Sequence, residues 1–289
     1  MTAIIFGING QDGFYLDQLL QSKNCNVIGV SRNEGCDISN FRDLSKLIGE
    51  TKPDYIFHLA ADSSTRHELL WTNYETIVTG SINIFEAVRN TSPNSKVFIA
   101  GSGLQFKNDG TQISETNSFE ARDVYSMCRI QSVYAARYYR TQGLKTYVGY
   151  LFNHDSPLRT ERHMSKKIAE VAKRIAAGSN EKIEIGDVSA VKEYSFAGDI
   201  VNAIWTLVNQ DKTYEAVIGS GKGYSIEDWL KECFSIVNLG WQDHVIPNKN
   251  FVSDYNQLVS DPAVLFSLGW KPKVSFRELA FMMMQPNRK

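Results

Sequence analysis

The strongest constraint on the fold is the regular alternation of short apolar runs with helical patterns over the first 151 residues. Runs typical of buried strands occur at 3–6, 26–30, 55–59, 96–100 and 145–151, and helical spacing of apolar residues separates them at 14–23, 41–50, 76–89 and 125–139. Such alternation requires parallel strands joined by right-handed crossovers. The sequence therefore predicts an α/β fold with a Rossmann-type, doubly wound parallel sheet.

The pattern changes after residue 151. A polar segment with one proline (153–162) predicts a loop, and further helices are predicted at 164–177, 200–208, 226–236, 261–268 and 276–284. We expect a dinucleotide-binding domain over 1–155, to which 195–218 returns, and a smaller C-terminal substrate lobe over 156–194 and 219–289. The lobe should pack on the carboxyl edge of the sheet, where open α/β sheets bind ligands.

Composition narrows the class of protein. A net charge of -1, with 43% hydrophobic and 22% charged residues, is typical of a globular protein and argues against nucleic-acid or membrane-surface partners. The N-terminus leads directly into a strand-like run, and no apolar run reaches the ~20 residues that span a bilayer. We therefore expect a cytoplasmic protein. We also expect no metal, because no Cys/His spacing matches a metal site. The scattered cysteines are Cys25, Cys36, Cys128 and Cys233.

A glycine-rich turn follows the first strand and opens the first helix. Its spacing is GxxGxxG over residues 7–13. Glycines let such a turn close, let backbone N–H groups reach a pyrophosphate, and let the helix approach the strand. The turn predicts a dinucleotide site, and the alternative is a turn without a ligand. The predicted contacts are Gly7, Asn9, Gly10, Gln11, Asp12 and Gly13.

The cofactor prediction depends on the ends of the next two strands. Arg32 follows the second strand, where an arginine favours NADP and an acid favours NAD. We expect NADP, with NAD possible; the alternative is that Arg32 is a solvated surface charge. Asp37 is placed to meet the adenine amino group, and His58 is expected to be a packed strand residue. The cofactor should pass the end of the third strand at Leu59, Ala60 and Ala61.

Three polar residues near the fourth strand are the catalytic candidates. Ser102 follows that strand, and Tyr125 and Arg129 lie four residues apart, on one face of the next predicted helix. A cation beside a tyrosine favours the phenolate, and a serine hydroxyl can hold a substrate oxygen. The three residues predict a proton relay beside a nicotinamide.

The chain resembles the extended short-chain dehydrogenase/reductases, most closely the GDP-mannose 4,6-dehydratases and their 4-keto-reductase relatives. The resemblance implies an enzyme acting on a nucleotide-diphospho-sugar, with a GDP-hexose as substrate and with Ser102, Tyr125 and Arg129 as the hydride-transfer triad at sugar C4. It also implies a homodimer through the predicted helices 76–89 and 125–139. The motifs that carry it lie at 7–13, 58–61, in the helix of Tyr125, at 152–157 and at 268–276.

Further site residues follow from the same resemblance. Asn153 would contact the substrate, and Lys192 falls where the family places an arginine facing the diphosphate. Lys166 and Lys167 are either phosphate neighbours or a solvated helix face.

Four departures from the family pattern bear on activity. Arg129 replaces a lysine, Leu104 replaces the glutamate that moves the C5 proton during water loss, and Phe251 replaces a second diphosphate arginine. The segment 33–36 is shorter than the one that joins the family's tetramer contacts. Three hypotheses remain: a nucleotide-sugar oxidoreductase at C4, a complete 4,6-dehydratase with a substitute acid, and a cofactor-binding protein without catalysis.

Overall fold

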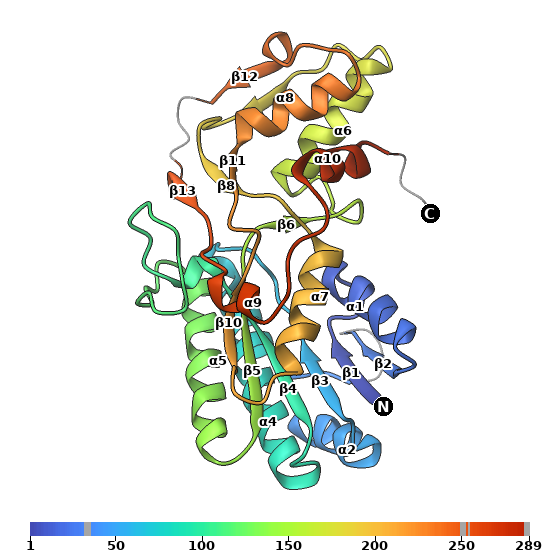
Figure 1. Ribbon diagram of the computed structural model, residues 1–289, viewed down its shortest axis with the longest axis vertical. Coiled ribbons are helices and arrows are strands. Elements are labelled where there is room, and N and C mark those ends of the chain that lie inside the picture. Colours follow the sequence, from blue (N-terminus) through green and yellow to red (C-terminus); the bar gives the residue numbers. More distant parts are fainter. Residues whose placement is uncertain (32–35, 249–252, 254, 286–289) are drawn as a thin grey trace.

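A six-stranded parallel sheet forms the lower half of the molecule in Figure 1. The computed structural model describes residues 1–31, 36–248, 253 and 255–285. The sheet order is β10-β5-β4-β3-β1-β2, and every adjacent pair is parallel. The Rossmann-type sheet predicted from the sequence is confirmed. Its strands are β1 (Thr2–Phe6), β2 (Asn26–Val30), β3 (Tyr55–His58), β4 (Lys96–Ser102), β5 (Lys145–Leu151) and β10 (Glu215–Ile218).

Helices cover both faces of this sheet. Alternate residues of β1 point to opposite faces, so that Ile4 and Phe6 join one buried cluster while Ala3 and Ile5 join the other. The first cluster is completed by α2 (Phe41–Thr51), α4 (Gly80–Thr91) and α5 (Val124–Thr141), and the second by α1 (Gln11–Ser22) and α7 (Ala197–Val208). Each large aliphatic side chain buried in this way contributes about 1.5–3 kcal/mol.

The order of the strands reverses between β1 and β3. From β1 the chain runs outward to β2 and then crosses to β3 on the other side of β1. Ligands of doubly wound sheets bind at such a switch point, outside the carboxyl ends of the strands. Here those ends are followed by Gly7 and Leu59.

The helix predicted at 76–89 differs from the observed segment. The structure has α3 (Leu70–Asn73), a π-helical turn (Tyr74–Thr79) and then α4. The buried His58 ring lies 3.1 Å from the Thr76 carbonyl oxygen. A side chain that engages a helix carbonyl is one recognised cause of a local departure from regular α-helical geometry.

The upper lobe in Figure 1 has a hydrophobic core of its own. Its helices are α6 (Met164–Ala176), α8 (Ile226–Ile236) and α10 (Phe276–Met284). Three small sheets, which the sequence analysis did not predict, complete the lobe and its junction: β7 (Ile183–Ile185) with β12 (Val245–Pro247), β8 (Val191–Glu193) with β11 (Gly223–Ser225) and β13 (Gln257–Leu258), and β6 (His154–Asp155) with β9 (Ser195–Phe196). The domain boundary at residue 155 stays a prediction.

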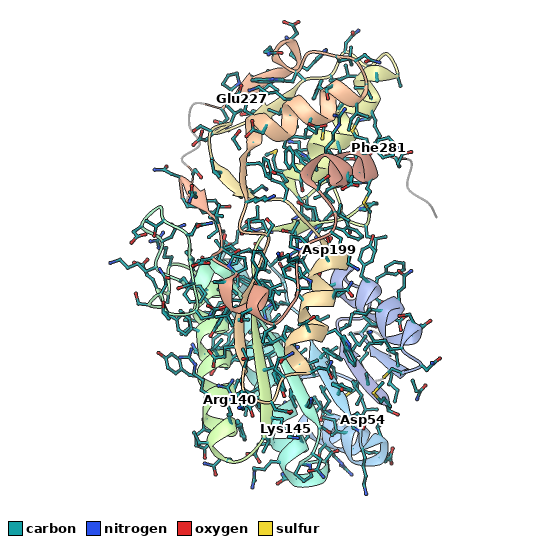
Figure 2. All side chains as sticks on the ribbon, viewed as in Figure 1. Asp54, Arg140, Lys145, Asp199, Glu227 and Phe281 are labelled. Atoms are coloured by element: carbon teal, nitrogen blue, oxygen red, sulfur yellow. The ribbon has the colours of Figure 1, made fainter. Side chains whose placement is uncertain are left out.

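The C-terminal segment is tied to the start of α7. Figure 2 shows Asp199 there, below the upper lobe. Its carboxylate accepts hydrogen bonds from the backbone N–H groups of Lys273 and Val274, both at 2.8 Å, and the Trp270 indole donates to its carbonyl. The remaining short helices are α9 (Ala263–Ser267) and the 3₁₀ turns His67–Leu69, Gly103–Gln105 and Gln242–His244. None of the helices in the described ranges is long and apolar enough to cross a membrane.

Candidate active site

The glycine-rich turn has the geometry that a phosphate-binding turn requires. Gly7 has a φ of +92°, and a Cβ there would lie 2.8 Å from the Ala60 nitrogen. A Cβ on Gly13 would lie 2.7 Å from the Ile8 Cα, so a side chain would push the helix away from the turn. Gly10 is the N-cap of α1 and has no side chain to cap it, which leaves the first amides of the helix free to face an anion.

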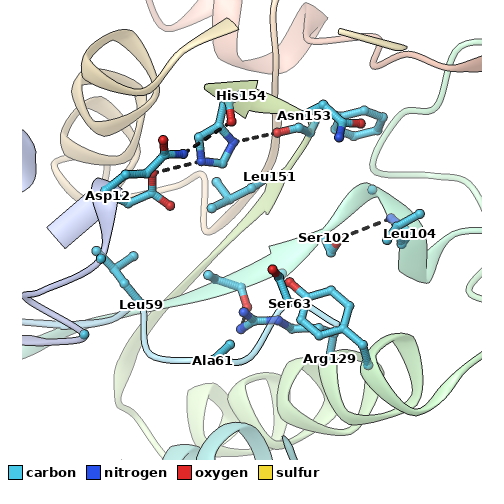
Figure 3. Close-up of a pocket in the computed structure, with 18 of the residues that line it drawn as sticks. Asp12, Leu59, Ala61, Ser63, Ser102, Leu104, Arg129, Leu151, Asn153 and His154 are labelled. Carbon is cyan, nitrogen blue, oxygen red and sulfur yellow. Dashed lines mark hydrogen bonds and ion pairs between the residues drawn. The ribbon is translucent and has the colours of Figure 1, made fainter. Parts of the chain in front are cut away.

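Two cavities meet at this turn and share Gly7, Gly10, Leu59 and Ala61 in their walls. One, of about 350 Å³, lies over the end of β2 and is lined by Asn9, Asp37, Ala60 and their neighbours. The other, of about 330 Å³ (Figure 3), reaches His163 at the start of α6 in the upper lobe. Together they form a long cleft across the switch point. The predicted contact Arg32 lies outside the described residues.

The second cavity brings the three catalytic candidates together. Ser102, Tyr125 and Arg129 all line it, and all three are buried, with 7%, 8% and 4% of their surface exposed. Ser102 caps the 3₁₀ turn after β4, and its hydroxyl accepts a hydrogen bond from the Leu104 N–H at 3.2 Å. Tyr125 is the second residue of α5, which Asp123 caps. A hydroxyl and a phenol therefore face one space.

Arg129 contacts the face of the tyrosine ring. Its guanidinium carbon lies 5.1 Å from the centroid of the Tyr125 ring, and its Nη1 donates to the Ala100 carbonyl at 2.5 Å. Its Nε finds no hydrogen-bond partner among the described residues. The positive charge thus acts on Tyr125 through the ring face, a cation–π contact. Burial and Arg129 together lower the pKa of the neighbouring His58 to about 3, and His58 lies buried in β3.

Leu104 lies beside Ser102 in the wall of the cavity. It also lines a third cavity of about 340 Å³ that continues past it. Within the described parts of these two cavity walls, the carboxylates are those of Asp12 and Asp123. Both are already bonded, Asp12 to His154 at 2.9 Å and Asp123 to the Ser126 N–H at 2.8 Å. An apolar side chain therefore stands where the resemblance implied a proton-transferring acid.

The loop after β5 supplies the wall opposite Ser102. Asn153 lines the cavity, and its side-chain oxygen is buried without a partner in the described part of the chain. His154, Arg159 and His163 line the same wall, and the sequence analysis did not single them out. Arg159 donates to the His154 carbonyl at 3.0 Å. The only sequence signal for them was their position in or beside the motif at 152–157.

The lysines have different surroundings. Lys166 is 2% exposed within the upper lobe and pairs with Glu170 at 2.8 Å, so it does not lie on a solvated helix face. Lys192 lies on β8 with its ammonium 5.1 Å from the Tyr194 ring centroid. Burial lowers the pKa of Lys192, Asp155 opposes this change, and Arg159 adds to it. Lys192 thus lies near the loop of Asn153. Among the described residues that line the cleft, none is Lys166, Lys167 or Lys192.

Comparisons with known proteins define the family. The family described as GDP-mannose 4,6 dehydratase matches residues 33–283. The chain belongs to this family. It is 30% identical, over an alignment of 317 residues, to GDP-mannose 4,6 dehydratase 1 of Arabidopsis thaliana, covering 97% of this chain and 88% of the relative. It is 24% identical to a GDP-mannose 4,6-dehydratase of Vibrio cholerae, covering 99% and 94%. Family membership identifies an enzyme of the dehydratase and epimerase type.

Solved structures share the fold over almost the whole length. The structure of RMD from Pseudomonas aeruginosa complexed with NADPH superposes with a TM-score of 0.88 at 17% identity, covering 98% of this chain and 97% of that one. The UDP-glucose 4-epimerase of Thermus thermophilus in complex with NAD gives a TM-score of 0.84 at 20% identity, covering 98% of both chains.

Within the described residues, no group of three or more His, Cys, Asp or Glu side chains could hold a metal ion.

Proposed function

We propose that this member of the family uses NADP, or NAD, to oxidise or reduce C4 of a nucleotide-diphospho-sugar, with a GDP-hexose as the substrate. The observation that carries the proposal is the long cleft. Its second cavity, which we call the catalytic-side cavity, is lined by the glycine turn, Ser102, Tyr125 and Asn153. Relatives named as GDP-mannose 4,6-dehydratases support the choice of sugar nucleotide.

The cleft fits a dinucleotide on two observations. A Cβ on Gly7 or Gly13 would fill the space where the backbone approaches the ligand, and the first amides of α1 have no side-chain cap among the described residues. The amides of the turn would hold the diphosphate, while Asn9 and Asp37 would face the adenosine. When bound, a nicotinamide dinucleotide supplies a hydride donor or acceptor.

The chain's own residues handle the proton. The Tyr125 hydroxyl would exchange a proton with the oxygen on sugar C4, and the Ser102 hydroxyl would hold that oxygen in place. The Arg129 guanidinium on the ring face would stabilise the negative charge that develops on the phenol. Arg129 therefore takes over the electrostatic part of the family lysine without a hydrogen bond to Tyr125.

The substrate would lie along the wall opposite Ser102. The unpartnered side-chain oxygen of Asn153 offers an acceptor to a sugar hydroxyl. We assign the substrate diphosphate to Arg159, which lines the cavity. Lys192, which lies beside the same loop but outside the cavity wall, would supply a second cation. The structure gives no support to Lys166 in this role, because its ammonium is buried against Glu170.

Leu104 favours oxidation or reduction over elimination. Water loss across C5 and C6 needs a group that moves the C5 proton, and leucine cannot transfer a proton. A complete dehydratase would need a substitute acid, yet the carboxylates that line the described cavity walls are engaged with His154 and Ser126. Hydride transfer at C4 needs only Tyr125, Ser102 and the cofactor.

Replacement of Tyr125 by phenylalanine tests the assignment. We expect Tyr125→Phe to abolish the conversion of GDP-sugars and to retain NADPH binding. Mass spectrometry of the products measures the conversion. Tyr214→Phe is the matched control, because Tyr214 precedes β10, lines none of the three cavities, and donates its hydroxyl to the Asp211 carbonyl. Full activity of Tyr125→Phe would refute the assignment. A 4-keto-6-deoxy product from GDP-mannose with the wild-type protein would instead establish a complete dehydratase.

The outer faces of α4 and α5 support the proposed homodimer. Ile82 on α4 and Tyr134 and Tyr138 on α5 are 40%, 57% and 59% exposed. Large apolar groups on adjacent helices are typical of a surface that a second copy covers.

A further inference from the structure

A buried ion pair joins the phosphate-binding turn to the loop after β5 that carries Asn153, which we call the sugar-side loop. Asp12 lies in the first turn of α1, and His154 lies 142 residues later, directly after Asn153. The His154 Nε2 is 2.9 Å from the Asp12 carboxylate, and the two side chains are 8% and 21% exposed (Figure 3). Both residues line the catalytic-side cavity.

Further hydrogen bonds connect the same two segments. The Gln11 side chain donates to the His154 carbonyl at 3.3 Å and accepts from the Ser156 hydroxyl at 2.9 Å. Within the loop, Arg159 donates to the same carbonyl at 3.0 Å. The turn that opens α1 and the loop that carries Asn153 are therefore held as one unit.

The ring of His154 requires two protons in this geometry. Its Nδ1 lies 2.7 Å from the Phe152 carbonyl oxygen, and its Nε2 faces the Asp12 carboxylate. Since the pKa of Asp12 is lowered and its carboxylate is ionised, both neighbours are acceptors, and both ring nitrogens must donate. Only the imidazolium has two N–H donors. The neutral ring would leave one nitrogen facing an oxygen lone pair.

We propose that His154 is a positioning residue which, as an imidazolium, holds the phosphate-binding turn against the sugar-side loop and neutralises Asp12, so that dinucleotide binding is linked to the protonation of His154. This inference rests on the proposed dinucleotide site. Without the cation, an uncompensated carboxylate would stand beside the turn amides and repel an incoming diphosphate.

The surrounding charges determine the direction of the pH dependence. Burial lowers the pKa of His154, but the charge and hydrogen bond of Asp12 outweigh burial and the repulsion from Arg159, and the pKa is raised above its ordinary value of 6.5. Burial raises the pKa of Asp12, but His154 and then Arg159 lower it below 3.8. The other titratable groups beside Arg159 are Asp155 and His163 on the same loop and Lys192 on β8.

The sign follows for each partner. The stabilisation from His154 is complete below pH 6.5 and is lost as the pH rises through the raised folded pKa. The stabilisation from Asp12 is present above pH 3.8 and is lost as the pH falls through its lowered pKa. The pair is therefore intact around neutrality, and dinucleotide affinity should fall on the alkaline side.

The first test observes the protonation state without any ligand. The full chain, labelled with ¹⁵N-histidine, is titrated by NMR, and resonances are assigned with His154→Gln and His163→Gln. We expect His154 to be doubly protonated at pH 7. His163 is the internal control, because its Nε2 faces the Arg159 guanidinium and burial lowers its pKa. A neutral His154 ring at pH 7 would overturn the inference.

The second test measures the linkage with NADPH and NAD as probes. From pH 6 to pH 9 the wild-type dissociation constant should rise, whereas His154→Gln should bind about tenfold more weakly at pH 7 (a tenfold change is about 1.4 kcal/mol) and show no such pH dependence. The double variant Asp12→Asn/His154→Gln should recover the affinity, because it removes both charges. His67→Gln, in the partly exposed 3₁₀ turn before α3, is the control.

The outcomes separate this inference from the proposed function. Wild-type affinity that does not change with pH, or a His154→Gln variant that binds like the wild type, would overturn the linkage. If the wild type binds neither dinucleotide at any pH, the proposed function fails, and the NMR titration still decides the protonation state of His154. That titration reads the protonation of the wild-type ring directly, and the two variants serve only to assign its resonances.

Discussion

Gly13→Ala should destabilise the fold and the dinucleotide site together. Gly13 is the third residue of α1, and a Cβ there would meet the Ile8 Cα and carbonyl oxygen at 2.7 Å, and the Gly7 carbonyl oxygen more closely still. Carbon atoms in ordinary contact are about 3.5–4.0 Å apart. All three contacts are with backbone atoms, so the turn itself must move.

The magnitude is the difference between two effects. Alanine is favoured over glycine in a helix by up to about 1 kcal/mol, whereas overpacking typically costs about 1–3 kcal/mol. We expect a net loss of about 1–2 kcal/mol, and each kcal/mol lowers Tm by about 2–4 °C in a protein of this size. NADPH affinity should fall as well, because the amides of the turn are displaced.

Gly49→Ala is the matched control for this prediction. Gly49 also lies in a helix, α2, but a Cβ there would lie 3.4 Å from the nearest atom, the Thr91 Cγ2, at the edge of ordinary contact. This variant should be about 0.5–1 kcal/mol more stable than the wild type and should bind NADPH normally. Urea unfolding and NADPH titration measure both variants. A Gly13→Ala protein as stable as the wild type, with unchanged NADPH affinity, would refute the reasoning.

Two further predictions concern charge. Burial raises the pKa of Glu215, but hydrogen bonds from Arg137, Tyr150 and Arg140 lower it from 4.5 to about 2. This shift stabilises the folded state by about 3 kcal/mol. The stabilisation is present above pH 4.5 and is lost as the pH falls toward 2. Glu215→Gln should lose a comparable amount in urea unfolding at pH 7, and an equal loss at pH 3 would contradict this origin. Leu104→Glu should add a 4-keto-6-deoxy product to assays with GDP-mannose, detected by mass spectrometry; an unchanged product spectrum would show that more than this one acid is missing.

Five strands of the main sheet were predictable because they form apolar runs, most of them buried, whereas β10 was not predicted. The run at 145–151 coincides with β5, and the runs at 26–30 and 96–100 give β2 and most of β4. The strands of the small sheets have two to three residues, too few to show a period of two, and they were not predicted. The π-helical turn at Tyr74–Thr79 contacts His58 of β3 through the Thr76 carbonyl, a contact between separate segments that no local pattern reveals.

The candidate site was predictable where the chemistry is local. The glycine turn, Ser102, Tyr125 and Asn153 follow strands or open helices, and the structure brings them to one cleft. The pairing of Asp12 with His154 joins segments 142 residues apart, and no spacing rule could reveal it. The contact of Arg129 with the tyrosine ring, rather than its hydroxyl, likewise depends on side-chain geometry.

The most direct test of the central claim is a thermal-shift and equilibrium-binding measurement with NADP(H), NAD(H) and a panel of GDP-, CDP-, UDP- and dTDP-sugars. A ligand at 100 times its dissociation constant stabilises the folded state by about 2.7 kcal/mol, which is readily detected. We predict that NADP(H) or NAD(H) raises Tm and that GDP-sugars raise it further. If no dinucleotide raises Tm or binds at millimolar concentration, the account of this cleft as a dinucleotide-dependent sugar-nucleotide site is wrong.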